Sequence, residues 1–213
     1  MGTDALRDEA VRRALDSFRE RLRKLVSESD PIDSLLPLFS PKVYARGESF
    51  ARAGWPCGTV ATVATGLFYV EEPSEEGAII VKDFIGPDRI LIASYGKGGD
   101  SGISITALRE SLVLEARWSD VLELYARYPS LAEAGRTVME REMSRMCSRV
   151  GDMIAHDAGE RYEAFLDREG DLVSEIPGYL LASWLGVTPT QLSRIRAARS
   201  RSLARSPSRT RLS

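Results

Sequence analysis

Residues 176–201, IPGYLLASWLGVTPTQLSRIRAARSR, decide the fold of the C-terminal part of the chain. Apolar side chains at helical spacing predict a first helix in this stretch: Leu180, Leu181, Trp184 and Leu185. Gly186 permits the left-handed turn that ends a helix. Thr188 and Gln191 then form the T-x-x-Q pattern of a capping box, which begins a second helix. A helix, a tight turn with glycine and a second helix form a helix-turn-helix motif.

The second helix of this motif carries side chains suited to DNA. In a helix-turn-helix unit this helix enters the major groove, where arginine, glutamine and hydroxyl groups hydrogen-bond to base edges. The candidate DNA-binding residues are Thr188, Thr190, Gln191, Ser193, Arg194, Arg196, Arg199 and Arg201. The last three are placed where phosphates would pass. Because helix-turn-helix units also serve as plain structural elements, DNA binding is a hypothesis at this point.

Charge is unevenly distributed along the chain. The formal net charge of the 213 residues is −2, but residues 176–213 contain seven arginines and no acidic residue. This segment carries +7 and the remainder carries −9. Such a split indicates a module that meets a polyanion. A solvated, disordered tail is the alternative, because residues 201–213, RSLARSPSRTRLS, are rich in arginine and serine.

Short β-branched or aromatic segments separated by turn residues fill the middle of the chain. The strand candidates are residues 59–65, 67–70, 78–85, 89–94, 102–107 and 111–118. About 75 residues of such strands suit an antiparallel β roll or jelly roll, and they include no crossover helix of a parallel sheet. The predicted class is α+β: N-terminal helices, the antiparallel β roll, a long dimerisation helix and a C-terminal helix-turn-helix domain.

A helix predicted over residues 130–154 carries a methionine-rich apolar stripe. Its members recur at intervals of 4, 3, 4 and 3 residues: Met139, Met143, Met146, Val150 and Met153. This spacing matches the a and d positions of a coiled coil. We therefore expect a homodimer with these five residues at the interface. One wide stripe that faces the core of a monomer is the alternative.

A further helix is predicted over residues 4–28, where apolar residues recur every three or four positions and Asp30-Pro31 breaks the pattern. The elements divide the chain into four predicted parts. They are an N-terminal helical lead (1–30), a β-roll sensor domain (31–128), the dimerisation helix with its hinge (129–157), and the DNA-binding domain with a basic tail (158–213).

These motifs together resemble the Crp/Fnr-type bacterial transcription regulators. The strongest likeness is ERYEAFLDREGDLVSEIPGYLLASWLGVTPTQLSRIRAAR, residues 160–199. In the roll, residues 45–72, ARGESFARAGWPCGTVATVATGLFYVEE, are similar to the glycine pattern of the family. The resemblance implies a cyclic-nucleotide-binding-like roll, a dimerisation helix that relays changes in the roll, and a DNA-binding domain. RNA polymerase is a further candidate partner.

The segment that would bind a cyclic nucleotide departs from the family pattern. Members that bind cAMP carry a Gly-Glu pair and an arginine there, for the ribose and the cyclic phosphate. The matching places hold Ile92-Ala93 and Ser101. We therefore expect no cAMP binding of the usual kind, and the effector is unknown. Residues 96–99, GKGG, are either an anion-binding loop or the tip of a hairpin.

Few residues are available for metal, redox or catalytic chemistry. Two cysteines and one histidine are too few for a four-thiolate iron–sulfur cluster or a zinc site with two histidines. We expect no cofactor and no metal. Cys57 is either a redox thiol or an inert small residue, Cys147 is expected to be packed, and His156 is interpreted as a hinge residue. Since no catalytic triad or carboxylate pair stands out, no enzymatic activity is expected.

The sequence therefore predicts a sequence-specific transcription regulator that binds double-stranded DNA as a homodimer. A small-molecule or redox-sensing module without DNA readout is the alternative. The segment MGTDALRDEAVRR lacks an apolar signal core, and no apolar run approaches the roughly 18 residues of a membrane helix. We therefore expect a cytoplasmic protein that does not bind membranes.

Overall fold

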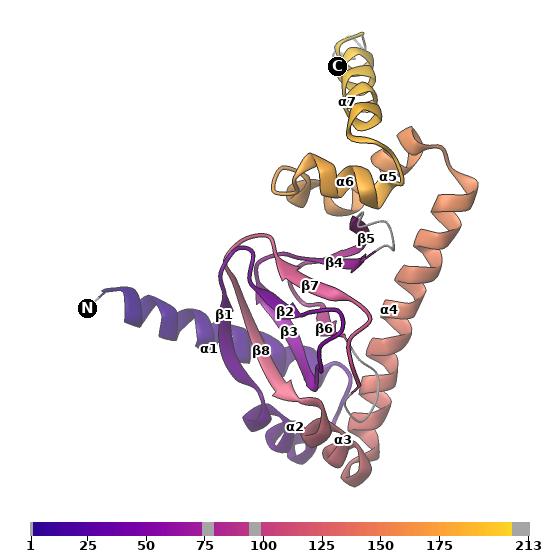
Figure 1. Ribbon diagram of the computed structural model, residues 1–213. Helices are drawn as coiled ribbons and strands as arrows, with labels where there is room; N and C mark the ends of the chain where they lie inside the picture. The colour runs from indigo at the N-terminus through magenta and orange to yellow at the C-terminus, as the bar shows by residue number, and fades with distance from the viewer. Residues whose placement is uncertain (1, 74–78, 94–98, 206–213) are drawn as a thin grey trace, which may run out of the picture. The chain divides into compact units, whose positions relative to one another are not determined.

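The computed structural model describes residues 2–73, 79–93 and 99–205 (Figure 1). The chain divides into two compact units, Met1–Arg145 and Met146–Ser213. The long helix α4 (Pro129–Ala155) begins in the first unit and ends in the second. Among the described residues, no helix has both the length and the apolar character that crossing a membrane requires.

The first unit begins with helices that pack on the outside of the roll. Helix α1 (Gly2–Arg23) is followed by α2 (Ser29–Leu35) and the short 3₁₀ helix η1 (Leu36–Leu38). The predicted end of α1 at residue 28 is wrong, because the chain turns after Arg23. The N–H groups of Leu25 and Val26 both donate to the carbonyl of Leu22, at 2.9 and 2.8 Å. This turn buries Val26 beneath α1 and α2.

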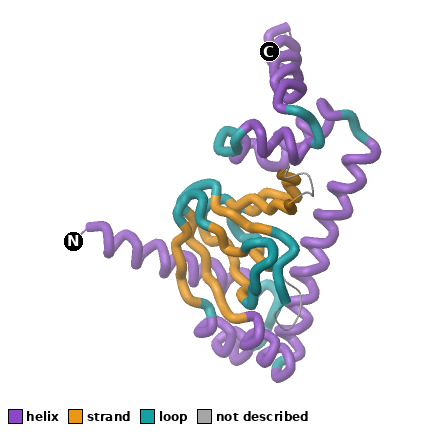
Figure 2. The backbone as a smooth tube through the Cα atoms, in the orientation of Figure 1, coloured by secondary structure: helices purple, strands orange, loops and turns teal. Residues whose placement is uncertain are grey.

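Eight described strands form the roll. They are β1 (Ser40–Tyr44), β2 (Ser49–Ala51), β3 (Thr59–Thr65), β4 (Phe68–Pro73), β5 (Ile79–Ile85), β6 (Ile90–Ile92), β7 (Ser104–Ala107) and β8 (Ser111–Arg117). They pair in two four-stranded antiparallel sheets, in the orders β1-β8-β3-β6 and β2-β7-β4-β5. Figure 2 shows the strands gathered together with the helices outside them.

Alternation along β3 shows how the sequence builds two layers of core. Ala61 and Val63 point into the roll and pack with the inner residues of the other sheet, such as Phe68 and Ile105. Val60 points outward, where it joins the cluster formed by the helices. Because side chains alternate between the two faces of a strand, a segment with apolar residues on both faces must be covered on both faces. The helices supply the outer cover.

The outer cover is completed by α3 (Trp118–Arg127) and the first turns of α4. Leu131 and Ala134 of α4 are buried in the same cluster as Val60. Further along α4, Glu142 binds Arg89 of the roll through an N–O contact of 2.5 Å. Asp83 holds the same guanidinium at 2.7 Å, and the side chain of Arg89 is only 14% exposed. A largely buried ion network therefore fixes α4 to β5 and to the segment between β5 and β6.

The second unit is helical. After the end of α4 it contains α5 (Ala158–Val173), α6 (Gly178–Leu185) and α7 (Pro189–Arg205). Helix α4 ends before His156 and Asp157, which connect it to α5. The carboxylate of Asp157 accepts hydrogen bonds from the N–H groups of Gly159 and Glu160, while Glu160 accepts one from the N–H of Asp157. This reciprocal capping box begins α5.

The predicted fold class is confirmed: N-terminal helices, an antiparallel roll, a long helix and a C-terminal helix-turn-helix arrangement make an α+β protein. The predicted interval 59–65 coincides with β3, and the other strand intervals overlap β4 to β8. Most of the predicted GKGG loop, residues 96–98 of 96–99, lies outside the described residues.

Candidate nucleic-acid interface

The turn between α6 and α7 is fixed by the backbone of Gly186. This residue adopts a left-handed conformation with φ 70° and ψ 34°, which glycine reaches without the steric cost of a side chain. The N–H of Gly186 donates to Ser183 O and the N–H of Val187 donates to Ala182 O, both at 3.0 Å. These bonds close the C-terminal end of α6 and direct the chain into α7.

The beginning of α7 is held by the predicted capping box. The N–H of Gln191 donates to the hydroxyl of Thr188 at 3.2 Å, and the N–H of Thr188 donates to Gln191 Oε1 at 2.8 Å. Pro189 occupies the first turn, where it forfeits no helical hydrogen bond. Leu192 is buried against α6. The capping box and the Leu192 contact therefore both restrain the rotation of α7 about its own axis.

Two arginines hold the end of α6, and sequence reasoning missed both. Arg149 of α4 donates to Trp184 O at 2.7 Å, and its guanidinium lies 4.8 Å from the centre of the Trp184 ring. Arg161 of α5 donates twice to Leu185 O, at 2.8 and 3.2 Å. Cations at the C-terminal end of a helix satisfy carbonyls that have no helical partner. A basic residue at either position gives no signal of this role in the sequence alone.

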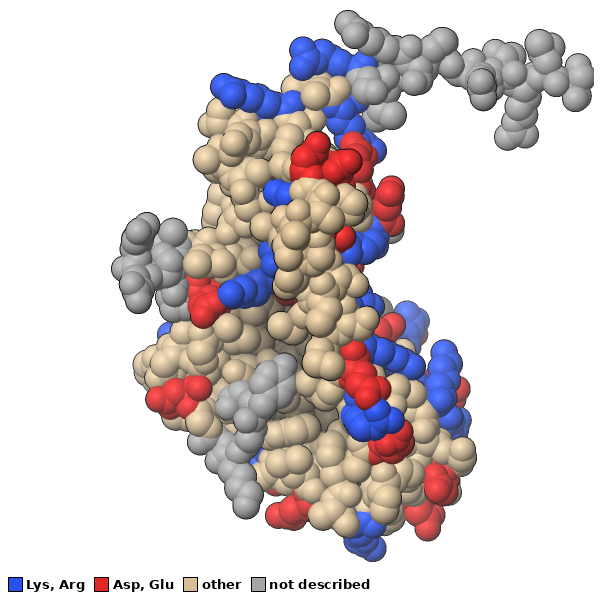
Figure 3. Space-filling view, turned by 90° about the vertical axis from the view of Figure 1, so that its right-hand side faces the viewer, with Lys and Arg blue, Asp and Glu red and all other residues tan. Residues whose placement is uncertain are grey.

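The outward side of α7 brings together most of the predicted DNA-binding residues. Six of them are exposed: Thr188, Thr190, Gln191, Ser193, Arg194 and Arg201. Thr190, Arg194 and Arg201 follow one another at intervals of four and seven residues, which places them on one side of a helix. Figure 3 shows basic side chains gathered over α7. We call these six residues the α7 outer face.

Arg196 and Arg199 lie elsewhere, on the side of α7 that packs against α5. The guanidinium of Arg196 lies 5.8 Å from the ring centre of Tyr162. Arg199 Nε donates to both carboxylate oxygens of Glu163 at 2.9 Å, and this bond raises the pKa of Arg199. Both arginines therefore hold α7 in place in this structure. Of the remaining arginines of the basic segment, Arg209 and Arg211 lie outside the described residues.

The methionine stripe of α4 is divided between two environments. Met139 is half-buried and lines a pocket of the first unit. The other four members, Met143, Met146, Val150 and Met153, are exposed, with 65% of Met146 accessible. Ile154 beside them is 82% exposed. A Cβ placed on Gly186 would lie 2.9 Å from Met153 Cε, so the last methionine of the stripe touches the turn of the helix-turn-helix unit.

The three positions that correspond to the Gly-Glu pair and the arginine of a cyclic-nucleotide site are buried and uncharged. Ile92 and Ala93 belong to the apolar core, and Ser101 is 2% exposed. The hydroxyl of Ser101 donates to Ile103 O at 2.5 Å and accepts from the N–H of Ile103 at 3.2 Å. It therefore closes a turn of the chain. These three positions provide no guanidinium for a phosphate and no carboxylate for a ribose.

The two cysteines differ in environment. Cys57 is buried in the core of the roll, which favours the inert small residue among the two interpretations of the sequence. Cys147 on α4 is exposed in the single chain, so the expectation that it is packed requires a partner chain. Among the described residues, no group of three or more histidine, cysteine or acidic side chains has the arrangement of a metal site.

Comparison with known proteins gives matches in structure only. No protein-family model and no curated protein sequence matches the chain. Among solved structures, FixK2 from Bradyrhizobium japonicum has a TM-score of 0.70 and 15% identity over 77% of this chain and 85% of its own. A putative transcriptional regulator of the Crp/Fnr family from Eubacterium rectale has a TM-score of 0.65 and 13% identity, covering 82% and 84% of the two chains.

A third solved structure, the c-di-GMP responsive regulator CLP from Xanthomonas campestris, has a TM-score of 0.64. Its identity is 14%, over 83% of this chain and 94% of its own. The likeness spans both the roll and the helices that follow it, which agrees with the resemblance found in the sequence. The chain has the fold of the Crp/Fnr-type transcription regulators.

Proposed function

We propose that the protein is a sequence-specific DNA-binding transcription regulator that acts as a homodimer. The observation that carries this proposal is the α7 outer face: exposed hydroxyl, amide and guanidinium groups on a helix whose rotation is restrained by Leu192 and the Thr188–Gln191 capping box. Arginine and glutamine side chains are the ones that hydrogen-bond adenine and guanine edges in a major groove. The two units are proposed to serve as sensor and reader.

Electrostatics support DNA as the partner. The segment 176–213 carries +7 and the rest of the chain carries −9. Each arginine that meets a phosphate releases condensed counterions, so it adds to affinity without reading sequence. A negatively charged body is repelled by the same phosphates. DNA is therefore attracted to the end of the chain that bears the α7 outer face and kept from the remainder.

Dimerisation is proposed from the exposed part of the methionine stripe. Four apolar side chains at a and d spacing on one helix form a surface that an identical helix complements. Methionine adapts its shape to a partner more readily than branched residues do. Two helix-turn-helix units in such a dimer would contact half-sites about one helical turn, or ~34 Å, apart. RNA polymerase is proposed as a further partner on the basis of the fold resemblance alone.

The deciding experiment is a titration of labelled palindromic DNA from the upstream region of the protein's own gene. Fluorescence anisotropy would be measured at two salt concentrations, with scrambled DNA as the reference. We expect tighter binding to the palindrome, and we expect Arg194→Ala to remove that preference. Arg12→Ala, an exposed change on α1, is the matched control. Equal affinity for scrambled DNA would refute sequence specificity.

The alternative, a sensing module without DNA readout, predicts that Arg194→Ala leaves regulation intact. We propose that cAMP is not the effector, because Ile92, Ala93 and Ser101 are uncharged and buried. A thermal-shift measurement with cAMP tests this directly. A clear increase in melting temperature would contradict it. We also propose that the protein has no catalytic activity of its own.

A further inference from the structure

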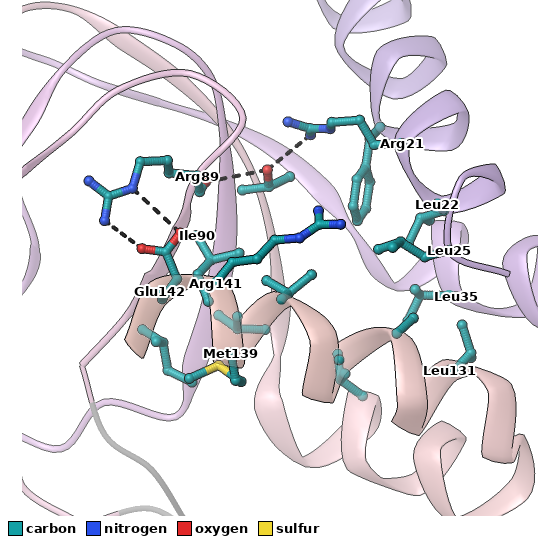
Figure 4. A pocket seen from close by; sticks show the side chains of 18 of the residues that line it. Arg21, Leu22, Leu25, Leu35, Arg89, Ile90, Leu131, Met139, Arg141 and Glu142 are labelled. Carbon is teal, nitrogen blue, oxygen red and sulfur yellow. Dashed lines mark hydrogen bonds and ion pairs between the residues drawn. The ribbon is translucent and has the colours of Figure 1, made fainter. Parts of the chain in front are cut away.

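The first unit contains a pocket of about 710 Å³ outside the roll. Its walls come from α1, the outer face of β3 and β6, α3 and the first half of α4 (Figure 4). Small-molecule sites have volumes of roughly 300–1,000 Å³. Among the described residues, none between Ala93 and Ala107 lines this pocket. Of the three positions that correspond to a cyclic-nucleotide site, Ile92 lines this pocket from the outer face of the sheet, whereas Ala93 and Ser101 do not.

The floor of the pocket is apolar. Its main contributors are aliphatic side chains of the outer sheet face and the helices: Leu35, Val60, Ile90, Ile92, Val121 and Leu131. The hydroxyl of Thr62 lies among them, but it already accepts a hydrogen bond from Arg21 at 3.0 Å and donates to Arg89 O. The floor therefore favours a ligand body without hydrogen-bonding groups, because apolar surface gains by leaving water.

The rim is basic. Six cationic side chains line the pocket, Arg21, Lys24, Arg89, Arg136, Arg141 and Arg145, against only two acidic ones, Asp88 and Glu142. Two of these cations are neutralised by the acidic lining itself. Arg21 pairs with Asp88, and Arg89 pairs with Glu142. Arg136 pairs outside the pocket with two glutamates of its own helix.

Three of the six cationic side chains remain without a carboxylate partner among the described residues. Within the described part of the chain, no carboxylate forms an ion pair with Lys24, Arg141 or Arg145. Figure 4 shows the guanidinium of Arg141 extending from α4 across the pocket toward α1 and the segment that follows it. Burial lowers the pKa of Arg21, with Asp88 acting in the opposite direction. The pocket therefore has a surplus of positive charge next to an apolar floor.

We propose that this pocket binds an anionic amphiphile, a single carboxylate on a hydrocarbon chain, with Arg141 and Arg145 at the carboxylate. Guanidinium groups bind carboxylates through charge-assisted hydrogen bonds, which are about twice as strong as neutral ones. The hydrocarbon chain occupies the floor between β3, β6 and the helices. This binding is independent of the proposed DNA contacts, since every lining residue belongs to the first unit.

The test uses 11-bromoundecanoate as the probe, below its micellar concentration, with 11-bromo-1-undecanol as its uncharged match. Bromine quenches tryptophan fluorescence on contact, and Trp118 lines the pocket whereas Trp55 and Trp184 do not. We expect saturable quenching by the carboxylate, absent in Trp118→Phe. We expect the alcohol to bind about tenfold more weakly or worse, the loss typical of one charged hydrogen bond.

Two variants locate the site. Arg141→Ala combined with Arg145→Ala removes exposed charges, so it should weaken carboxylate binding at least about tenfold while leaving alcohol binding unchanged. Val138→Phe fills the pocket from α4 and should abolish the binding of both probes. Arg12→Ala is the control for charge removal. Equal binding of acid and alcohol, unchanged binding in the double variant, or no quenching at all would overturn the proposal.

Discussion

Helices α4 and α7 leave opposite kinds of surface exposed. The second half of α4 presents methionine, valine and isoleucine side chains, and it has no apolar neighbour that covers them among the described residues. The exposed side of α7 presents hydroxyl, amide and guanidinium groups, while its apolar side is buried on α6. An apolar face is suited to another apolar face, and a cationic face is suited to a polyanion. We therefore propose a different partner for each helix, a second copy of the chain for α4 and DNA for α7.

The largest effect is expected from a charge placed in the middle of the methionine stripe. Met146→Glu should convert the proposed dimer to a monomer, because two like charges would meet at the interface, at a cost of several kcal/mol. The fold of the single chain should not change, since 65% of Met146 is exposed. Sedimentation equilibrium measures the result.

The matched control for this change is Ser148→Glu, an exposed position on the same helix that does not belong to the stripe. It should leave the dimer intact. A wild-type protein that is already monomeric at micromolar concentration would contradict the proposed role of α4, and so would a Met146→Glu variant that remains dimeric.

Arginine substitutions on α7 should separate base readout from phosphate contact. Arg194→Ala should weaken binding to the specific site by about 5- to 150-fold, corresponding to ~1–3 kcal/mol for one bidentate base contact. Arg201→Ala should weaken binding to all sequences alike and lower the salt slope by about one unit. Anisotropy titrations over a range of salt concentrations distinguish the two. If both variants lost the same affinity for scrambled DNA, base readout and phosphate contact could not be assigned to different arginines.

A substitution at Gly186, in the turn between α6 and α7, should weaken the support of the α7 outer face without replacing any of its six residues. Gly186→Ala should destabilise the second unit by about 1–2 kcal/mol, because alanine tolerates the left-handed conformation poorly. Unfolding by denaturant, followed through Trp184 of α6, measures this. Gly170→Ala is the control, since a Cβ there meets open space and should be neutral or slightly stabilising. A neutral Gly186→Ala would show that the turn is not under this constraint.

The smallest effect concerns the two thiols. Cys147 is exposed and Cys57 is buried, so a thiol reagent should modify one cysteine quickly in the native protein and both after denaturation. Cys147→Ser should remove the fast phase. Because Cys147 follows Met146 directly, dimerisation should slow its reaction, and the rate should rise in Met146→Glu. Rapid modification of Cys57 would contradict its place in the core of the roll.

Local patterns predicted much of this structure. The β-branched run at residues 59–65 predicted β3, and the T-x-x-Q spacing predicted the start of α7, because both depend on neighbours in sequence. The end of α1 was mispredicted because its apolar spacing continues through Leu25, while the backbone turns to bury Val26. Helical periodicity does not detect such a turn.

Contacts between distant residues were the part that the sequence did not indicate. Arg196 and Arg199 were assigned to phosphates from the arginine run on α7. Their contacts with Tyr162 and Glu163 were not foreseen, because these partners lie on α5 and the run gives no information about them. The pocket outside the roll, with its basic rim, was also missed, since its walls come from helices and strands far apart along the chain. The division into four parts and the roles of the DNA-binding and interface residues stay predictions.

The capping box at the start of α7 has a consequence for which bases the helix can select. Gln191 Oε1 accepts hydrogen bonds from both the N–H and the hydroxyl of Thr188, so the amide would meet DNA through its NH₂ group. Arg194 is likewise a donor only. Guanine, thymine and adenine N7 offer acceptors in the major groove, whereas cytosine offers only its amino donor. We therefore expect the contacted bases of the operator to be guanine, thymine or adenine, and not cytosine, on the strand that faces Gln191 and Arg194.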